Sequence, residues 1–262
     1  MRLPPSVVSL APAPSTLAGS LTTNSTRLLV SVRDSREAQL ARRSGVPWID
    51  LKDPDNGSLG AAGEAIAAAV AGELRASDML PESLISAAVG ELRDEPLQTA
   101  LRLAQYFPLL KVGLAGVQAD AQWQRRWLEL AKQIDGAGAE LVPVIYADHA
   151  LCGAPSPIEV LSLAQRTQVG RLGYLLIDTY TKDGRRLHDW MGRAQIEQTI
   201  QAAAEVGRRV VLAGSLTAQD LPGLLSLPIA AVAVRGAVCS GDRRSGLCPE
   251  KLRQWVDYLQ IR

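Results

Sequence analysis

Residues 48–54 read Trp-Ile-Asp-Leu-Lys-Asp-Pro, a short apolar run that ends in charged residues. Similar runs rich in β-branched residues recur along the chain, separated by amphipathic stretches with helix-capping signals. Eight such strands alternating with helices in about 235 residues predict a single-domain (β/α)8 TIM barrel. A doubly wound sheet is the weaker alternative, because no strand is followed by a GxGxxG turn. The strand candidates are residues 28–32, 48–52, 84–89, 109–112, 141–146, 173–178, 210–213 and 230–234.

The helix starts between these strands carry recognisable capping signals. Each start has an Asp, Ser or Thr in the capping position, or a proline in the first turn, and three of them also carry an acidic residue three positions on. The signals are Asp34 with Glu37 and a terminal Gly45, Ser156-Pro157-Ile158-Glu159, Asp189 before a run that stops at Gly207, Thr217 with Asp220, and Pro249 before the last helix.

The composition excludes several classes of protein. Hydrophobic residues make up 47% and charged residues 21%, which indicates a soluble globular chain, and the net charge of +1 gives no whole-chain case for nucleic acid or an anionic membrane. No apolar run reaches the roughly 18 residues of a membrane span. Nucleic-acid and membrane partners are therefore not expected, and the oligomeric state, including a homo-oligomer, stays open.

The N-terminal residues and the cysteines bear on domain organisation and compartment. Residues 1–26 contain four prolines and no periodic pattern, so we expect a flexible extension before a catalytic domain at 27–262. A signal peptide is disfavoured, because prolines interrupt the apolar segment that it needs. Cys152, Cys239 and Cys248 fit neither a disulfide framework nor a zinc site, which favours a reducing cytoplasm.

Lysine is scarce in this chain. Of 28 basic side chains only five are lysines, which leaves 23 arginines. A lysine that persists in such a chain is a candidate for chemistry that arginine cannot perform, because only an amine can lose its proton near neutral pH and attack a carbonyl. The five are Lys52, Lys111, Lys132, Lys182 and Lys251.

Lys52, Lys111 and Lys182 fall at or just after the ends of predicted strands, whereas the other two lysines fall within predicted helices. The active site of a TIM barrel forms at the C-terminal ends of its strands. Neighbouring amines disfavour one another's protonation, so the cluster predicts a lysine with a lowered pKa that can act as a nucleophile.

Carboxylates accompany these lysines at the strand ends. Asp50 and Asp178 are placed to transfer protons beside a reacting lysine. The alternative interpretation is that the three lysines simply form salt bridges with Asp50, Asp53 and Asp178.

The ends of the last two strands suggest the class of ligand. Barrels often bind phosphate there, through backbone N–H groups and a helix N-terminus. Gly214 and Ser215 lead into the helix that Thr217 is expected to cap, and Arg235 and Gly236 offer a fork of donors beside a turn of small residues. We expect these four residues to bind a substrate phosphate; a pair of ordinary tight turns is the alternative.

These motifs together resemble the (5-formylfuran-3-yl)methyl phosphate synthase family. The resemblance covers about residues 27–260, and the paired blocks at the second and sixth strands make it specific. The blocks that carry it are residues 28–32, 50–54 with 56–60, 111–114, 178–179 with 182–184, and 235–237.

The resemblance implies a TIM barrel and a reaction. Two molecules of glyceraldehyde 3-phosphate are condensed to 4-(hydroxymethyl)-2-furancarboxaldehyde phosphate, a precursor of the furan of methanofuran, with loss of phosphate and water. On this reading Lys52 forms a Schiff base, and Asp50, Lys111, Asp178 and Lys182 act in acid–base steps or orient the intermediate. No metal or organic cofactor is needed.

Other readings remain open at this stage. Residues 50–55 also fit Asp-x-Lys-x-x-Asp, which resembles the orotidine phosphate decarboxylase superfamily, where the lysine stays protonated and donates a proton; such a barrel would act on a phosphorylated acid. Two further lysines count against it. A class I aldolase acting on phosphosugars would use the same imine. A non-enzymatic phosphosugar-binding barrel would have lost site residues, and no such loss is evident.

Overall fold

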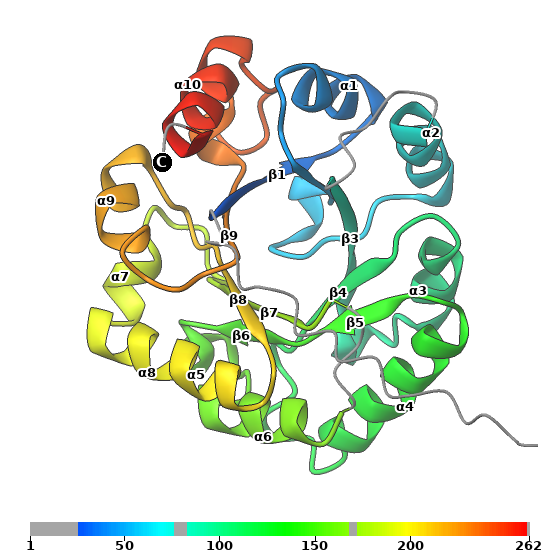
Figure 1. The fold of residues 1–262 in the computed structure, drawn as a ribbon. Helices are drawn as coiled ribbons and strands as arrows, with labels where there is room; N and C mark the ends of the chain where they lie inside the picture. The colour runs from blue at the N-terminus through cyan, green and yellow to red at the C-terminus, as the bar shows by residue number, and fades with distance from the viewer. Residues whose placement is uncertain (1–25, 76–82, 168–171, 261–262) are drawn as a thin grey trace, which may run out of the picture.

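Parallel strands in one sheet form the centre of the molecule (Figure 1). The computed structural model describes residues 26–75, 83–167 and 172–260, and the sheet order within them is β5-β4-β3-β2-β1-β9-β8-β7-β6. The strands are β1 (Arg27–Val32), β2 (Trp48–Leu51), β3 (Leu84–Glu91), β4 (Leu109–Gly113), β5 (Glu140–Val142), β6 (Val144–Tyr146), β7 (Tyr174–Asp178), β8 (Arg209–Leu212) and β9 (Ala231–Val234).

The two ends of this sheet are joined by a single residue. Strands β5 and β6 are separated only by Pro143, so the predicted strand at 141–146 is broken in two. The break follows from proline chemistry, because Pro143 has no N–H to donate to a ladder. Its carbonyl still accepts from the amide of Leu176 on β7 at 3.0 Å. The chain thus passes from one edge of the sheet to the other, and the predicted TIM barrel is confirmed.

Helices surround the sheet on its outer side (Figure 1). In the described residues they are α1 (Ser35–Arg43), α2 (Glu64–Arg75), α3 (Leu97–Ala104), α4 (Trp123–Gly136), α5 (His149–Cys152), α6 (Pro157–Gln165), α7 (Leu187–Trp190), α8 (Arg193–Glu205), α9 (Leu221–Leu224) and α10 (Pro249–Gln260). Single 3-10 turns are η1 (Pro54–Asn56), η2 (Leu92–Asp94), η3 (Ala218–Asp220) and η4 (Gly236–Val238).

Apolar spacing explains why the helices pack on the barrel. In α4 the buried residues Trp123, Trp127, Leu130 and Ile134 recur every three or four positions and form one stripe. Removing a side chain of this size from water stabilises the fold by about 1.5–3 kcal/mol. The strands are buried on both faces, so they supply a continuous apolar core beneath the site.

Three of the predicted helix starts are confirmed. The carboxylate of Asp34 accepts from the amide of Glu37 at 2.9 Å, which caps α1. Ser156 and Glu159 form the predicted capping box of α6. Helix α10 begins at Pro249.

Two other helix starts differ from the prediction. Asp189 lies inside the one-turn helix α7, because its carboxylate accepts from the amide of Arg186 at 2.7 Å and closes that turn; the long helix α8 follows Gly192. Thr217 caps only the single turn η3 before the four-residue α9. The expected flexible extension at 1–26 lies, except for residue 26, outside the described residues.

No helix among the described residues combines the length and the apolar character needed to cross a membrane.

Candidate active site

Strand register brings the first polar cluster together inside the barrel. Ser31, Asp50 and Ser86 lie side by side on β1, β2 and β3. The Asp50 carboxylate is 1% exposed, accepts from Ser31 Oγ at 3.2 Å and Ser86 Oγ at 2.6 Å, and forms an ion pair with Lys111 on β4. Lys111 is itself only 4% exposed, so this buried charge pair is internally balanced.

A second cluster forms at the end of β7. Asp178 accepts from Lys182 Nζ at 3.0 Å, from the amide of Thr179 at 2.7 Å and from Ser58 Oγ at 3.1 Å. Burial by itself raises the pKa of Asp178, but the positive charges of Lys182 and Lys52 outweigh it, and the pKa lies below its ordinary value. Asp178 is therefore an ionised carboxylate at neutral pH.

Lys52 is the first residue after β2 and differs from the other two strand-end lysines. Within the described residues its amine makes no hydrogen bond or ion pair with another group. Burial lowers the pKa of Lys52 from 10.5 to about 7. The charge of Asp178 raises this pKa and the charge of Lys182 lowers it. Asp50 also raises it and Lys111 also lowers it, both with smaller effects. The charges of the two neighbouring ion pairs thus oppose each other, and desolvation is the largest influence on this pKa.

The structure combines both interpretations that the sequence left open. Lys111 and Lys182 form salt bridges, as the alternative interpretation expected, whereas Lys52 is left unpaired beside them. Crowding by amines was the expected cause of a lowered pKa, and burial is the larger one. With a pKa of about 7, about half of the Lys52 amine is neutral at pH 7, against about 0.03% for an ordinary lysine.

Lys52 lies at the wall of a cavity of about 280 Å³ at the C-terminal mouth of the barrel. Asp178 and Lys182 line the cavity beside it, whereas Asp50 and Lys111 do not. All four residues expected to bind phosphate contribute to the lining: Gly214, Ser215, Arg235 and Gly236.

The backbone on the β8 and β9 side of this cavity presents unused donors. Gly214 and Ser215 have positive φ angles of 106° and 52°. The amides of Ser215, Gly236 and Ala237 donate to no acceptor within the described residues. Successive free amides of this kind form a concave site for an anion. The helix that was expected to add its dipole here is too short to do so, since η3 is a single turn.

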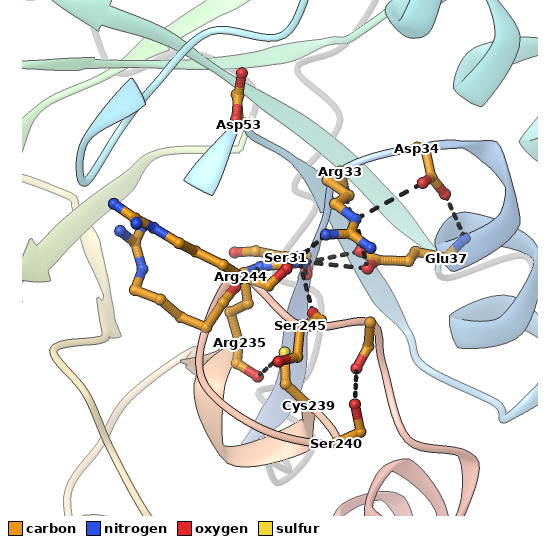
Figure 2. A network of polar contacts seen from close by, with 12 residues as sticks. Ser31, Arg33, Asp34, Glu37, Asp53, Arg235, Cys239, Ser240, Arg244 and Ser245 are labelled. Carbon is orange, nitrogen blue, oxygen red and sulfur yellow. Dashed lines mark hydrogen bonds and ion pairs between the residues drawn. The ribbon is translucent and has the colours of Figure 1, made fainter. Parts of the chain in front are cut away.

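The side chain of Arg235 is placed differently from the expectation (Figure 2). Its Nη1 donates to Glu37 Oε2 at 2.8 Å and to the carbonyl of Ser31 at 2.9 Å, and its Nε donates to the carbonyl of Arg243 at 2.6 Å. Arg235 as a whole is only 5% exposed, although it contributes to the lining of the cavity. The fork of donors expected for phosphate is thus engaged by the protein itself.

Arg243 is the cavity residue that the sequence did not single out. It follows η4 in the loop before α10 and lines the cavity together with Lys52 and Asp178. Its Nη1 and Nη2 donate to the carbonyls of Pro54 at 2.9 Å and Gly57 at 3.0 Å, across the mouth. Sequence offers no signal that separates it from the adjacent arginine.

A buried pair formed by residues of β6 and β3 lies beside Asp178. Tyr146 on β6, beside Asp178 in register, donates from its hydroxyl to Glu91 Oε1 at 2.7 Å, and the amide of Ala115 donates to Glu91 Oε2 at 2.9 Å. Burial raises the pKa of Glu91. Burial, followed by the charge of Glu91, also raises the pKa of Tyr146 well above its ordinary value.

Other polar residues near the mouth have local structural roles. Asp53 accepts from the amide of Asp55 at 2.9 Å and caps η1, and within the described residues it forms no ion pair with a lysine. Asp148 accepts from the amides of Tyr180 and Thr181, both at 2.7 Å, and fixes the loop after β7. Among the described residues there is no group of three or more His, Cys, Asp or Glu arranged to hold a metal ion.

Lys132 and Lys251 lie within helices, as predicted. Lys132 is exposed on α4. Lys251 is less solvated than expected, because its Nζ donates to the carbonyl of Cys239 at 2.6 Å and ties α10 to the loop after β9.

Comparison with known proteins identifies the family of this chain. A family model described as 4-HFC-P synthase matches residues 28–256. The chain is 32% identical over 228 residues to (5-formylfuran-3-yl)methyl phosphate synthase of Methanopyrus kandleri, an alignment that covers 84% of this chain and 92% of that protein. The protein of the same description from Methanococcus maripaludis is 32% identical over 230 residues, with the same coverage.

Solved structures share the fold with this chain. Phosphoribosyl anthranilate isomerase, in complex with reduced 1-(o-carboxyphenylamino)-1-deoxyribulose 5-phosphate, superposes with a TM-score of 0.58 at 13% identity, covering 90% of this chain and all of that one. At this identity the likeness supports the barrel alone. The family model, by contrast, spans nearly the whole described barrel, and the relatives match over most of their own length. The resemblance read from the strand-end motifs is confirmed, and the chain belongs to the 4-HFC-P synthase family.

Proposed function

We propose that this protein condenses two molecules of glyceraldehyde 3-phosphate into 4-(hydroxymethyl)-2-furancarboxaldehyde phosphate through an imine on Lys52. The balance of the reaction is one furan phosphate, one inorganic phosphate and two molecules of water from the two trioses. The proposed role is in methanofuran biosynthesis in the cytoplasm. The names of the family and of its relatives support the product.

The observation that carries the mechanism is the unpaired amine of Lys52, with a pKa of about 7, at the wall of the cavity. A neutral amine attacks an aldehyde carbon, and loss of water leaves an iminium that draws electrons from the adjacent carbon. A proton can then leave that carbon, and the resulting enamine can attack a second carbonyl or expel a phosphate.

The two carboxylates take different roles in this proposal. Asp178 lines the cavity and is ionised, so it can accept the proton that leaves the carbon, and Lys182, hydrogen-bonded to it, can return a proton. Asp50 and Lys111 lie deeper and do not reach the cavity lining. They orient the strand ends and balance charge beneath Lys52. Free amides at Ser215 and Gly236 face the phosphate.

The rival barrel chemistry uses a lysine differently. A lysine that donates a proton to a carbanion reacts as the ammonium, whereas imine formation needs the neutral amine, and a pKa of about 7 supplies both forms at neutral pH. The family name of the relatives and the two further lysines, Lys111 and Lys182, disfavour the decarboxylase-like reaction, and both reactions make Lys52 essential. A class I aldolase would share the imine and is separated by its product.

Borohydride trapping tests the proposal directly. The protein is incubated with glyceraldehyde 3-phosphate and borohydride, and the adduct is mapped by peptide mass spectrometry. We expect one reduced triose phosphate on Lys52 and, without borohydride, a furan aldehyde that absorbs in the near ultraviolet.

Matched variants complete this experiment. Lys52→Arg keeps the charge but cannot form an imine, and it should lose both the adduct and the product. Lys132→Arg, on the exposed face of α4, should behave as the unmodified chain. An adduct found only away from Lys52 rejects the mechanism, and decarboxylation of a phosphorylated acid without an adduct supports the rival. An adduct with aldol products but no furan supports an aldolase.

A further inference from the structure

The loop at residues 239–248 folds back over the mouth of the barrel and presents Arg243 to the cavity. The stem of Arg243 lies over Gly236, where an added Cβ would be 3.7 Å from Arg243 Cβ. Its guanidinium spans from the end of β9 to the carbonyls of Pro54 and Gly57 on the loop that follows Lys52. Arg243 therefore lines the same cavity as Lys52 and the free amides at the end of β9.

The hydrogen bonds of Arg243 are incomplete. Two of the five N–H donors of a guanidinium are used by the two carbonyls. Within the described residues the others have no acceptor, and no carboxylate pairs with Arg243. Burial lowers the pKa of Arg243, and the charge of Asp178, which raises this pKa, offsets burial only in part.

Neighbouring arginines are compensated by contrast. Arg33 contacts Glu37 at 3.2 Å, Arg235 contacts the same carboxylate at 2.8 Å, and Arg244 contacts Asp55 at 3.2 Å. A partly buried cation without a carboxylate, facing a cavity lined by free amides, is the arrangement that an anionic ligand completes.

Arg235 explains how Arg243 is held in place (Figure 2). The buried Arg235 guanidinium is anchored by Glu37, and it donates to the carbonyls of Arg243 at 2.6 Å and Ser245 at 3.3 Å. Arg33 donates to the carbonyl of the intervening Arg244. Three consecutive loop carbonyls are thus fixed from below, so the Arg243 side chain is aimed at the cavity.

We propose that Arg243 is the side chain that binds the phosphate of the triose phosphate reacting with Lys52, and that Arg235 is a positioning residue for it. This assignment rests on the proposed function. The phosphate oxygens would take the unused N–H groups of Arg243 and the free amides of Ser215 and Gly236. Because the same guanidinium contacts the loop after Lys52, a bound phosphate also fixes the distance to the reacting amine.

The test compares Arg243→Ala with Arg244→Ala, a matched loss of one positive charge at the next position of the same loop. Initial rates of borohydride-trapped adduct are measured with glyceraldehyde 3-phosphate and with glyceraldehyde, which lacks the phosphate. We expect Arg243→Ala to lower the rate with the phosphorylated triose about 10- to 100-fold, the usual loss for hydrogen bonds to a charged group. Its rate with glyceraldehyde should change less than about twofold, and Arg244→Ala should change neither rate.

Three further measurements guard against a trivial loss of structure. Added guanidinium ion should partly restore Arg243→Ala with the phosphorylated triose, which a general unfolding would not permit. Arg243→Lys keeps a cation but loses the forked donors of a guanidinium, so its trapping rate with the phosphorylated triose should lie between those of the unmodified chain and Arg243→Ala. Arg235→Lys should reduce the preference for glyceraldehyde 3-phosphate over glyceraldehyde and should also lower the midpoint temperature of unfolding. Equal losses with both aldehydes, or no loss with the phosphorylated one, overturn the assignment.

Phosphate binding separates this inference from the proposed reaction. Inorganic phosphate is titrated into the full-length protein by calorimetry, without any aldehyde. Weaker binding in Arg243→Ala than in Arg244→Ala supports the phosphate site even if no imine forms with any variant, a result that would reject the reaction alone. Equal phosphate binding by the two variants rejects Arg243 as the ligand while leaving Lys52 chemistry intact.

Discussion

Replacing Lys52 by methionine should stabilise the fold while abolishing imine formation. The folded pKa of Lys52, about 7, lies below the 10.5 of the unfolded chain, so the unfolded state binds more protons between these values. Stability contributed by this group therefore rises with pH across that window and is lowest below pH 7. A difference of 3.5 pKa units corresponds to about 5 kcal/mol at low pH, at 1.36 kcal/mol per unit.

The pH dependence of this gain is the quantity to measure. From the same two pKa values, the cost of Lys52 is about 5 kcal/mol at pH 6 and about 1.5 kcal/mol at pH 9.5. Because the side chain is partly exposed, we expect half to all of this difference, about 1.5–3 kcal/mol. Any constant effect of the methionine itself, such as altered packing, cancels between the two pH values.

Urea denaturation followed by tryptophan fluorescence can measure the effect, since Trp48 and Trp127 are fully buried. Lys52→Met should exceed the unmodified chain in unfolding free energy more at pH 6 than at pH 9.5. Lys132→Met, at an exposed helical position, should show no such pH-dependent difference. A gain that is constant with pH, or larger at pH 9.5, would refute the lowered pKa and the neutral-amine mechanism built on it.

Three further changes test the surroundings of Lys52. Lys111→Met should lower the free energy of unfolding in urea by about 3–5 kcal/mol, because it leaves the buried Asp50 without its counter-ion. Adding Asp50→Asn should recover most of that loss. A double variant that is as unstable as Lys111→Met alone would contradict the pairing. Gly60→Ala would place a Cβ 2.5 Å and 2.6 Å from two carbonyl oxygens of the loop after β2. We therefore expect about 1–3 kcal/mol of destabilisation and slower imine trapping. Unchanged trapping kinetics would mean that this loop does not position Lys52. Tyr146→Phe removes a hydrogen bond to Glu91 and should cost about 1 kcal/mol and raise the Glu91 carboxyl pKa further, measured by carbon-13 NMR; a lowered pKa would exclude the hydroxyl as its donor.

The local patterns of the sequence were sufficient for the barrel. Strand runs such as residues 28–32 and 48–52 are short and buried on both faces, so their apolar character alone marks them, and each capping signal acts within one helical turn. The prediction was wrong where two local signals competed. Pro143 broke a strand that its apolar neighbours favoured, and Asp189 closed a separate turn in place of starting the long helix.

The candidate site was predictable only as a set of residue types. Because the C-terminal ends of barrel strands meet at one mouth, the positions of Lys52, Lys111 and Lys182 along the chain were enough to bring them to one face. Their ionisation was not, because it depends on burial and on which carboxylate each amine reaches. Asp50 forms an ion pair with Lys111, and Asp178 forms one with Lys182, so Lys52 remains without an ion-pair partner beside these two pairs.

Arg235 and Arg243 show most clearly what the sequence determines and what depends on the tertiary structure. By itself the sequence determined the fold and which lysines lie at the C-terminal mouth of the barrel, where the candidate site is, because these follow from periodicity and strand-end position. Only the tertiary structure decided that Arg235 is an anchor and Arg243 a cavity residue. Arg235 meets Glu37 across 198 positions of sequence, and Arg243 meets Gly57 across 186. Contacts of that separation are set by the closure of the barrel, and no local pattern encodes them.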